Sequence, residues 1–372
     1  MRAASIHATV GERLAARTLE LVNIASVSGD ESSILEVIHN RLPDGLHVVD
    51  DGDAVLFVEP AARRPGAPFV VLAGHVDTVP ANGNHPGTFD GDAVLGRGTA
   101  DMKGAIAVME EVAAWLAADP GATDLDLGFL LFGREELPIA QSALLPLFAR
   151  SPTTRSIDLA ILMEPTANAI QVGCLGNLNA WIRVRGSAAH TARPWLGRNA
   201  IHSAIRALAP IADLMPRDVE IDGLVFREVV SVTSIEGGIA GNVVPDRLDA
   251  RVNFRYAPTR TPAEAETWLR EMVSRPDVEI EVIGNAPPCS VSVRNPLVDR
   301  LRSAGNLAIE PKQAWTPVAE FATIEVDAVN FGPGDPQYAH RDDERIDTSA
   351  LVRSYEVLRR FLAAQKEAKE TG

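Results

Sequence analysis

FVVLAGHVDTVP, residues 69–80, is the stretch that decides the fold of this 372-residue chain. Its first six residues are an apolar run without alternation, which is typical of a strand buried on both faces. His75 and Asp77 follow where this strand ends. Open α/β folds place their sites at the carboxyl ends of parallel strands. The stretch therefore predicts a parallel sheet that is covered by helices and carries chemistry at one edge.

The same alternation of helix and buried strand extends over the first half of the chain. The patterns predict helices over 5–25, 31–42, 102–118 and 138–150, and further strands over 125–132 and 157–163. The alternation of helix and strand resumes after a middle region, with a helix over 296–304, a strand over 328–331 and a terminal helix over 348–370. These two regions, 1–173 and 287–372, are expected to form one α/β domain with a mostly parallel sheet.

The middle region follows a different order. Its patterns predict strands over 178–185, 226–235, 248–256 and 278–283, with helices over 200–214 and 262–275. The order β-α-β-β-α-β is that of a ferredoxin-like module. Residues 174–286 are therefore expected to form an inserted α+β domain.

Composition restricts the class of partner. The chain has 35 Lys and Arg against 50 Asp and Glu, a net charge of −15. A chain with this negative charge repels nucleic acid and anionic membrane surfaces. We therefore expect neither as a partner. The first 21 residues are interrupted by charges and no apolar run reaches the roughly 18 residues of a membrane span. With only two cysteines, these features predict a cytoplasmic protein.

Titratable side chains recur at the predicted strand ends. In extended chain His75 and Asp77 point the same way, so the carboxylate can orient the imidazole while its other nitrogen binds a metal. An ordinary surface histidine is the alternative. Asp101 lies in GRGTADMKG, residues 96–104, where helix capping is the alternative. A dinucleotide site is disfavoured there because the third glycine of that motif is absent.

Three further strand ends complete the pattern. Glu135 and Glu136 follow the strand 125–132, Glu164 follows 157–163, and His340 comes after 328–331. For the paired glutamates a solvated turn is the alternative. Mixed histidine and carboxylate ligands with one carboxylate able to bridge suit two zinc ions.

On these motifs the chain resembles the dinuclear-zinc family of aminoacylases, glutamate carboxypeptidases, acetylornithine deacetylases and succinyl-diaminopimelate desuccinylases. The resemblance covers essentially the whole chain. It is most specific at GHVDTVP (74–80), GTADMKG (98–104), the Glu135-Glu136 pair and GNVVP (241–245), and 163–166, 186–190 and 331–340 look most like the desuccinylases.

The resemblance implies two Zn²⁺ per chain, with Co²⁺ or Mn²⁺ as substitutes. His75 and Glu164 would hold one ion, Glu136 and His340 the other, and Asp101 would bridge them.

The resemblance also implies roles for five other residues. Glu135 would be the general acid and base, and Asp77 would orient the first histidine ligand. The inserted domain would be the lid and dimerisation domain of a homodimer. From it His190 would reach the partner subunit's site to stabilise the oxyanion, and Asn242 and Arg255 would meet the substrate. An ordinary loop histidine is the alternative for His190.

One segment departs from the desuccinylase pattern. Where members commonly carry Thr-Asp or Ser-Asp and then Arg-Phe, this chain reads WTPVAEF over 315–321. Pro317 replaces the Asp and Glu320 replaces the Arg. If that Arg holds a substrate carboxylate, Glu320 would repel it.

The leading hypothesis is metal-dependent hydrolysis of an N-acyl amino acid, with N-succinyl-L,L-2,6-diaminopimelate, of lysine and diaminopimelate biosynthesis, as the expected substrate. Another N-acyl amino acid, such as acetylornithine, or a dipeptide is the alternative within the enzyme class. A non-catalytic metal-binding relative is the alternative outside it. Separately, Cys174 and Cys289 flank the inserted domain, so oxidation could join its two connections.

Overall fold

The computed structural model describes residues 8–364, and this part of the chain divides into two compact units. The larger unit runs to Val172 and also contains Ser292–Glu310 and the chain from Glu320 onward. The smaller unit consists of Gly173–Val291 and Pro311–Ala319. Residues 5–7 and 365–370 of the expected terminal helices lie outside the described residues.

An eight-stranded sheet forms the centre of the larger unit, in the order β1-β2-β6-β3-β7-β15-β8-β14. Its middle strands β6, β3, β7 and β15 are parallel, while β1, β2 and β8 pair antiparallel at the flanks. The α/β prediction is confirmed, with antiparallel edges that the apolar runs did not reveal. The strands are β1 Leu46–Asp50, β2 Val55–Pro60, β3 Phe69–His75, β6 Asp126–Phe132, β7 Leu159–Leu162, β8 Ile170–Val172, β14 Ile309–Pro311 and β15 Ala328–Asn330.

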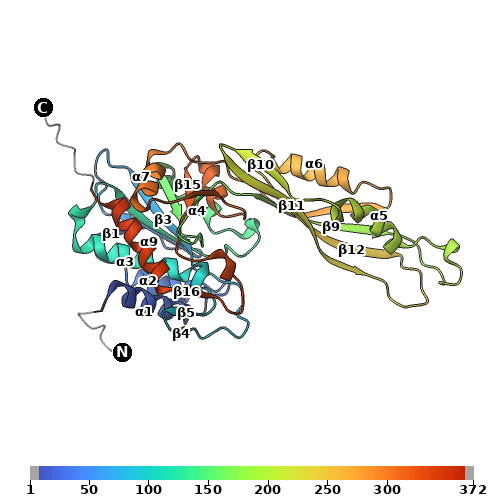
Figure 1. Cartoon of the computed structure of the whole chain (residues 1–372), viewed down its shortest axis with the longest axis horizontal. Coiled ribbons are helices and arrows are strands. Elements are labelled where there is room, and N and C mark those ends of the chain that lie inside the picture. The colour runs from blue at the N-terminus through green and yellow to red at the C-terminus, as the bar shows by residue number, and fades with distance from the viewer. Residues whose placement is uncertain (1–7, 365–372) are drawn as a thin grey trace. The chain divides into compact units, whose positions relative to one another are not determined.

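Every residue of β3 and β6 is buried, as continuous apolar strands require. Helices α1, α3 and α9 contact one another, and α7 packs on α9 (Figure 1). The helices are α1 Val10–Val22, α2 Ser32–His39, α3 Gly104–Ala118, α4 Leu144–Arg150, α7 Pro296–Gly305 and α9 Thr348–Leu362, and the short helix α8 Val318–Phe321 begins in the smaller unit and ends in this one. A small sheet of β4 Thr88–Asp90, β5 Ala93–Leu95 and β16 Arg345–Asp347 completes this unit.

The predicted helix over 138–150 is wrong at its start. Helix α4 begins only at Leu144, after a short 3₁₀ turn over Ile139–Gln141. The reason is local, because the Ser142 hydroxyl accepts a hydrogen bond from the Leu144 amide at 3.0 Å. This bond gives a partner to one of the first-turn amides of α4, which have no carbonyl partner within the helix.

The smaller unit has the expected β-α-β-β-α-β order, with one additional strand. Its antiparallel sheet runs β10-β11-β12-β9-β13, and α5 and α6 cover one face of it (Figure 1). The unpredicted strand β10 forms a hairpin with β11 through Asp222 and Gly223, both at positive φ. That pair is the usual signal for a two-residue hairpin turn. The elements are β9 Gly176–Arg185, α5 Ala200–Ala212, β10 Arg217–Ile221, β11 Leu224–Gly237, β12 Arg247–Tyr256, α6 Pro262–Met272 and β13 Val278–Ala286.

The unit boundaries differ from the expected insertion of 174–286. Residues 287–291 and 311–319 also belong to the smaller unit. Hydrogen bonds explain this, because the Trp315 indole donates to the Pro287 carbonyl at 3.1 Å and Gln313 exchanges bonds with Val225 and Arg227 of β11. A segment distant in sequence therefore completes the smaller unit.

Cys174 and Cys289 lie side by side in the smaller unit, as buried thiols on antiparallel chain segments. Each backbone amide donates to the other residue's carbonyl, at 3.2 and 3.1 Å. Burial raises the pKa of Cys174 to about 11, so little of this thiol is the reactive thiolate near pH 7. Their pairing under oxidant stays a prediction.

Candidate metal centre

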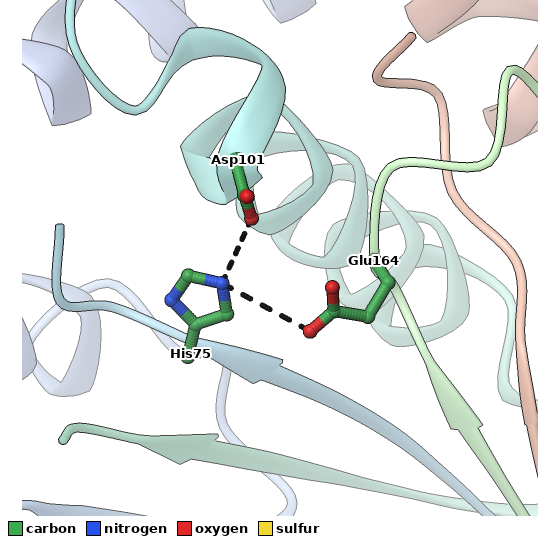
Figure 2. A group of neighbouring side chains, drawn as sticks. All are labelled: His75, Asp101 and Glu164. Atoms are coloured by element: carbon green, nitrogen blue, oxygen red, sulfur yellow. Dashed lines mark hydrogen bonds and ion pairs between the residues drawn. The ribbon is translucent and has the colours of Figure 1, made fainter. Parts of the chain in front are cut away.

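Three of the predicted ligands meet at the carboxyl end of the parallel strands (Figure 2). His75 is the last residue of β3, Glu164 follows β7, and Asp101 lies in the irregular turn Thr99–Lys103 before α3. His75 Nε2 is 3.0 Å from Asp101 Oδ1 and 3.9 Å from Glu164 Oε1. The His75 side chain is only 1% exposed, so its position is set by the surrounding core.

A second group of candidate ligands shares Asp101. His340 Nε2 lies 2.7 Å from Glu136 Oε1 and 3.4 Å from Asp101 Oδ2. The two oxygens of Asp101 thus face different histidines. One carboxylate between two sets of ligands is the arrangement that a bridged pair of metal ions needs.

Asp77 holds the loop that carries Glu135 and Glu136. Its carboxylate accepts hydrogen bonds from the backbone amides of both glutamates, each at 3.2 Å, and from the Ser28 hydroxyl at 2.7 Å. His75 Nδ1 is nearer to the backbone carbonyl of Asp77, at 3.0 Å, than to its carboxylate, at 3.5 Å. Both the carbonyl and the carboxylate of Asp77 therefore lie beside Nδ1 of the imidazole.

Glycines allow the last loop to approach the others. A Cβ at Gly334 would lie 2.2 Å from the Ala100 carbonyl oxygen, and one at Gly332 would lie 2.3 Å from that of Met163. The Gly332 amide also donates a hydrogen bond to the Thr166 hydroxyl oxygen at 3.0 Å. The loop after β15 can pack between the Asp101 and Glu164 segments because it has no side chain at these two positions.

The carboxylates and histidines shift one another's pKa values. Burial raises the pKa of Glu135 well above its usual range, and the negative charge of Glu164 adds to the rise. Burial lowers the pKa of His75, but hydrogen bonds to Asp101 and Asp77 outweigh it and leave the pKa well above its usual value. Hydrogen bonds to Asp101 and Glu136 raise the pKa of His340 to about 10. These shifts report a concentration of negative charge that favours bound cations.

The donor set fits two divalent metal ions. His75, Asp101 and Glu164 offer ligand atoms that lie within 4.8 Å of one another, and so do Asp101, Glu136 and His340. Each set mixes imidazole with carboxylate, the combination that zinc accepts. The five predicted ligands are therefore brought together, with Glu135 beside His75 and Glu136.

The other three predicted residues lie in the smaller unit. His190 and Asn242 are neighbours, since the Thr191 amide donates to the Asn242 carbonyl at 3.1 Å and His190 pairs with Val243. Both residues are exposed. Arg255 is near the other end of β12, where its Nε donates to Asn253 Oδ1 at 3.0 Å. Arg247 is the first residue of β12 and lies at the end of the strand that is near His190. Roughly 26 Å of extended strand separates Arg255 from Arg247.

Sequence reasoning missed residues that support the ligands. Glu344 is buried and bonded to the backbone of the Asp101 segment, and Glu31 accepts a hydrogen bond from the Arg134 amide at 3.2 Å. Glu344 follows two other acidic residues, in a run that reads as surface charge. Nothing local distinguishes it.

Glu320 is placed differently from the sequence expectation. It is 3% exposed and accepts a hydrogen bond from the Ser142 hydroxyl. Burial raises the pKa of Glu320 to about 7, so near neutral pH it is divided between protonated and ionised forms. The expected repulsion of an anionic substrate is correspondingly weaker.

Comparison with known proteins finds one family model that matches this chain and relatives that share one name. The model of peptidase family M20/M25/M40 matches residues 71–364. A Mycobacterium tuberculosis protein (strain CDC 1551 / Oshkosh), named provisionally as succinyl-diaminopimelate desuccinylase DapE, is 37% identical over 93% of this chain and 96% of its own length. The succinyl-diaminopimelate desuccinylase of Corynebacterium glutamicum is 34% identical over 93% and 95%.

The fold has solved counterparts. The M20 family metallo-carboxypeptidase Sso-CP2 from Sulfolobus solfataricus superimposes with a TM-score of 0.76 at 17% identity, covering 94% of this chain and 98% of that one. At this identity the likeness concerns the fold alone. Within the described residues, no helix is long and apolar enough to cross a membrane.

Proposed function

Because this chain belongs to peptidase family M20/M25/M40, a family of metal-dependent hydrolases, we propose that it removes the acyl group of an N-acyl amino acid. The family makes the chain a metallohydrolase of amide bonds. N-succinyl-L,L-2,6-diaminopimelate is the proposed substrate. The names of the relatives at 34–37% identity over 93% of the chain support it. The proposed place of action is the cytoplasm, which the low cysteine content supports.

The observation that carries the proposal is the Asp101 carboxylate between two histidines, with Glu135 beside them. Two zinc ions held by the five ligands would polarise the scissile carbonyl and acidify a water molecule, and Co²⁺ or Mn²⁺ would substitute for them. Glu135 would take the proton of the attacking water and return it to the leaving amine. Asp77 would keep His75 and the Glu135 loop in position through the contacts described above.

The test is hydrolysis by the purified, zinc-loaded protein. We expect it to release succinate and a free amine from the proposed substrate, detected by chromatography. Glu135→Gln should keep two zinc ions per chain and lose turnover by roughly 10²–10⁴-fold, because the proton carrier is gone. Glu136→Gln is the matched comparison, since it should also weaken metal binding. A Glu135→Gln rate near that of the wild type would contradict the mechanism.

The acyl group needs a separate experiment, because position 320 carries Glu where desuccinylase-like sequences carry Arg. A panel of N-acyl amino acids with and without a second carboxylate, including acetylornithine and dipeptides, separates the alternatives. We expect the highest kcat/KM for the succinylated substrate. A higher value for a substrate without that carboxylate would reassign the chain within the family.

The smaller unit is proposed to supply substrate contacts and a dimer interface. His190 and Asn242 would act together at the partner subunit's site, which their proximity supports. Arg255 would contact a substrate carboxylate at a different position from His190 and Asn242. Its distance from these two residues along β12 supports this assignment.

A homodimer through the smaller unit is supported by two apolar features. Ile205 on α5 and Ile235 on β11 are 61% and 58% exposed. Strand β11 pairs with β10 only as far as Glu228, and among the described residues no strand pairs with that side of Val229–Gly237. An unpaired edge is a template for another chain, and a second copy aligned on β11 would also cover α5.

A further inference from the structure

Glu344 is a buried carboxylate that faces the backbone of the bridging ligand. Its side chain has no exposed surface. One oxygen, Oε1, accepts hydrogen bonds from the amides of Gly98, Ala100 and Asp101, at 3.0, 3.2 and 3.2 Å. The other, Oε2, pairs with Arg97 Nη1 at 2.7 Å. Both oxygens thus bind the segment that carries Asp101.

That segment needs such a partner because it is not a regular helix. Asp101 has φ −128° and ψ 90°, and Gly98 has φ 85°. Amides at an irregular turn lack the carbonyl partners that a helix provides, and buried amides without partners are costly. Glu344 meets three of these amides with one oxygen. The carboxylate therefore replaces the missing backbone acceptors.

Glu344 also joins this segment to the second metal position. It lies four residues after His340 and just before β16, and its carbonyl accepts a hydrogen bond from the Gly96 amide at 2.9 Å. The His340 side chain is 48% exposed, so the core does not fix its place as it does for His75. Anchoring at Glu344 limits the distance between the His340 loop and Asp101.

We propose that Glu344 is a positioning residue that presets the Asp101 and His340 segments for metal binding. The inference rests on the proposed dinuclear function and adds a residue that binds no metal itself. Groups behind the ligands commonly change metal affinity by about 10–100-fold. Glu344 acts on the backbone of one ligand and on the chain position of another, so its loss would affect the shared bridge.

The test compares Glu344→Ala and Glu344→Gln with the wild type, using zinc affinity as the readout. Zinc dissociation constants come from competition with a chromophoric chelator, and circular dichroism checks the fold of the metal-free chains. We expect Glu344→Ala to bind zinc about 10–100-fold more weakly. Glu344→Gln should lose less zinc affinity than Glu344→Ala, because its side-chain amide oxygen still accepts hydrogen bonds from the backbone. It should not reach the affinity of the wild type, because the ion pair with Arg97 is lost.

Glu228→Ala is the matched control. Glu228 is also buried, and it accepts hydrogen bonds from the Ala257 amide and from Arg260, both at 3.0 Å, within the smaller unit. This variant should unfold at a lower temperature yet bind zinc as the wild type does. The proposal would be overturned if Glu228→Ala weakened zinc binding as much as Glu344→Ala does. It would also be overturned if Glu344→Gln bound zinc with the affinity of the wild type. Glu344→Gln carries the test if Glu344→Ala does not fold.

The measurements distinguish a failure of the positioning role of Glu344 from a failure of the proposed hydrolase function. A wild type that binds two zinc ions but cleaves no acylated substrate removes the function and leaves the positioning role. An active wild type with unchanged zinc affinity in Glu344→Gln removes only the positioning role. A wild type that binds no zinc overturns both.

Discussion

Glu320 shows how burial changes the meaning of a single residue. Read in the sequence, it is a negative charge at a position where an arginine is common. In the fold, it is buried and bonded to Ser142 at the start of α4. Burial raises the pKa of Glu320 from 4.5 to about 7. Its effect on stability therefore depends on pH.

The sign of that dependence is testable. A carboxyl whose folded pKa is raised contributes stability that is fully present below pH 4.5 and is lost as pH rises through 7. Glu320→Gln removes the ionisation, so its free energy of unfolding relative to that of the wild type should rise between pH 5 and 8, by at most roughly 3 kcal/mol. Scanning calorimetry of both proteins at each pH measures it. Glu36→Gln, on the exposed side of α2, is the control, and a pH-independent Glu320→Gln difference would refute the assignment.

At the scale of elements, the loop after β15 depends on close backbone approach. The sequence FGPGDP, residues 331–336, reads as an ordinary turn. The structure shows that its glycines let it pack on the carbonyls of Ala100 and Met163. The ligand segments are therefore held by contacts between loops as well as by the strands behind them.

Gly334→Ala tests this packing. The added Cβ would lie 2.2 Å from the Ala100 oxygen and 2.9 Å from Pro165 Cβ, so the loop or the Asp101 segment must shift. We expect a loss of about 1–3 kcal/mol in stability, as for other overpacked sites, and weaker zinc binding. Thermal unfolding and zinc titration measure the two effects.

Gly284→Ala is the matched control, because a Cβ there meets nothing within 4 Å. It should leave zinc binding unchanged and alter stability little. Wild-type behaviour of Gly334→Ala would show that the loop tolerates a side chain and that the approach is not required.

At the scale of the whole molecule, the proposed homodimer gives the clearest prediction. The wild type should sediment at about twice the 39.8 kDa of one chain, measured by analytical ultracentrifugation. Ile205→Asp should shift the population toward monomer, because it places a charge in the apolar face that a second copy would cover. Since each chain carries −15, added salt should strengthen association by screening repulsion.

Ile283→Asp is the control for this interface. Ile283 is 41% exposed on β13, the strand at the opposite edge of the same sheet. It should leave the sedimentation of the wild type unchanged. A monomeric wild type, or equal dissociation by both variants, would contradict an interface on β11 and α5.

The sequence by itself predicted the α/β alternation, the inserted module and the candidate ligands. His75, Glu135, Glu136 and Glu164 each follow an apolar run within a few residues, so short stretches of sequence carry this signal. Only the tertiary structure decided which oxygen of Asp101 faces which histidine, that Glu320 is buried, and that Glu344 binds the backbone of the Asp101 segment. Glu344 acts on an amide 243 residues away in the chain. Contacts of that kind leave no local pattern, because they arise when the strands bring distant loops to one edge of the sheet.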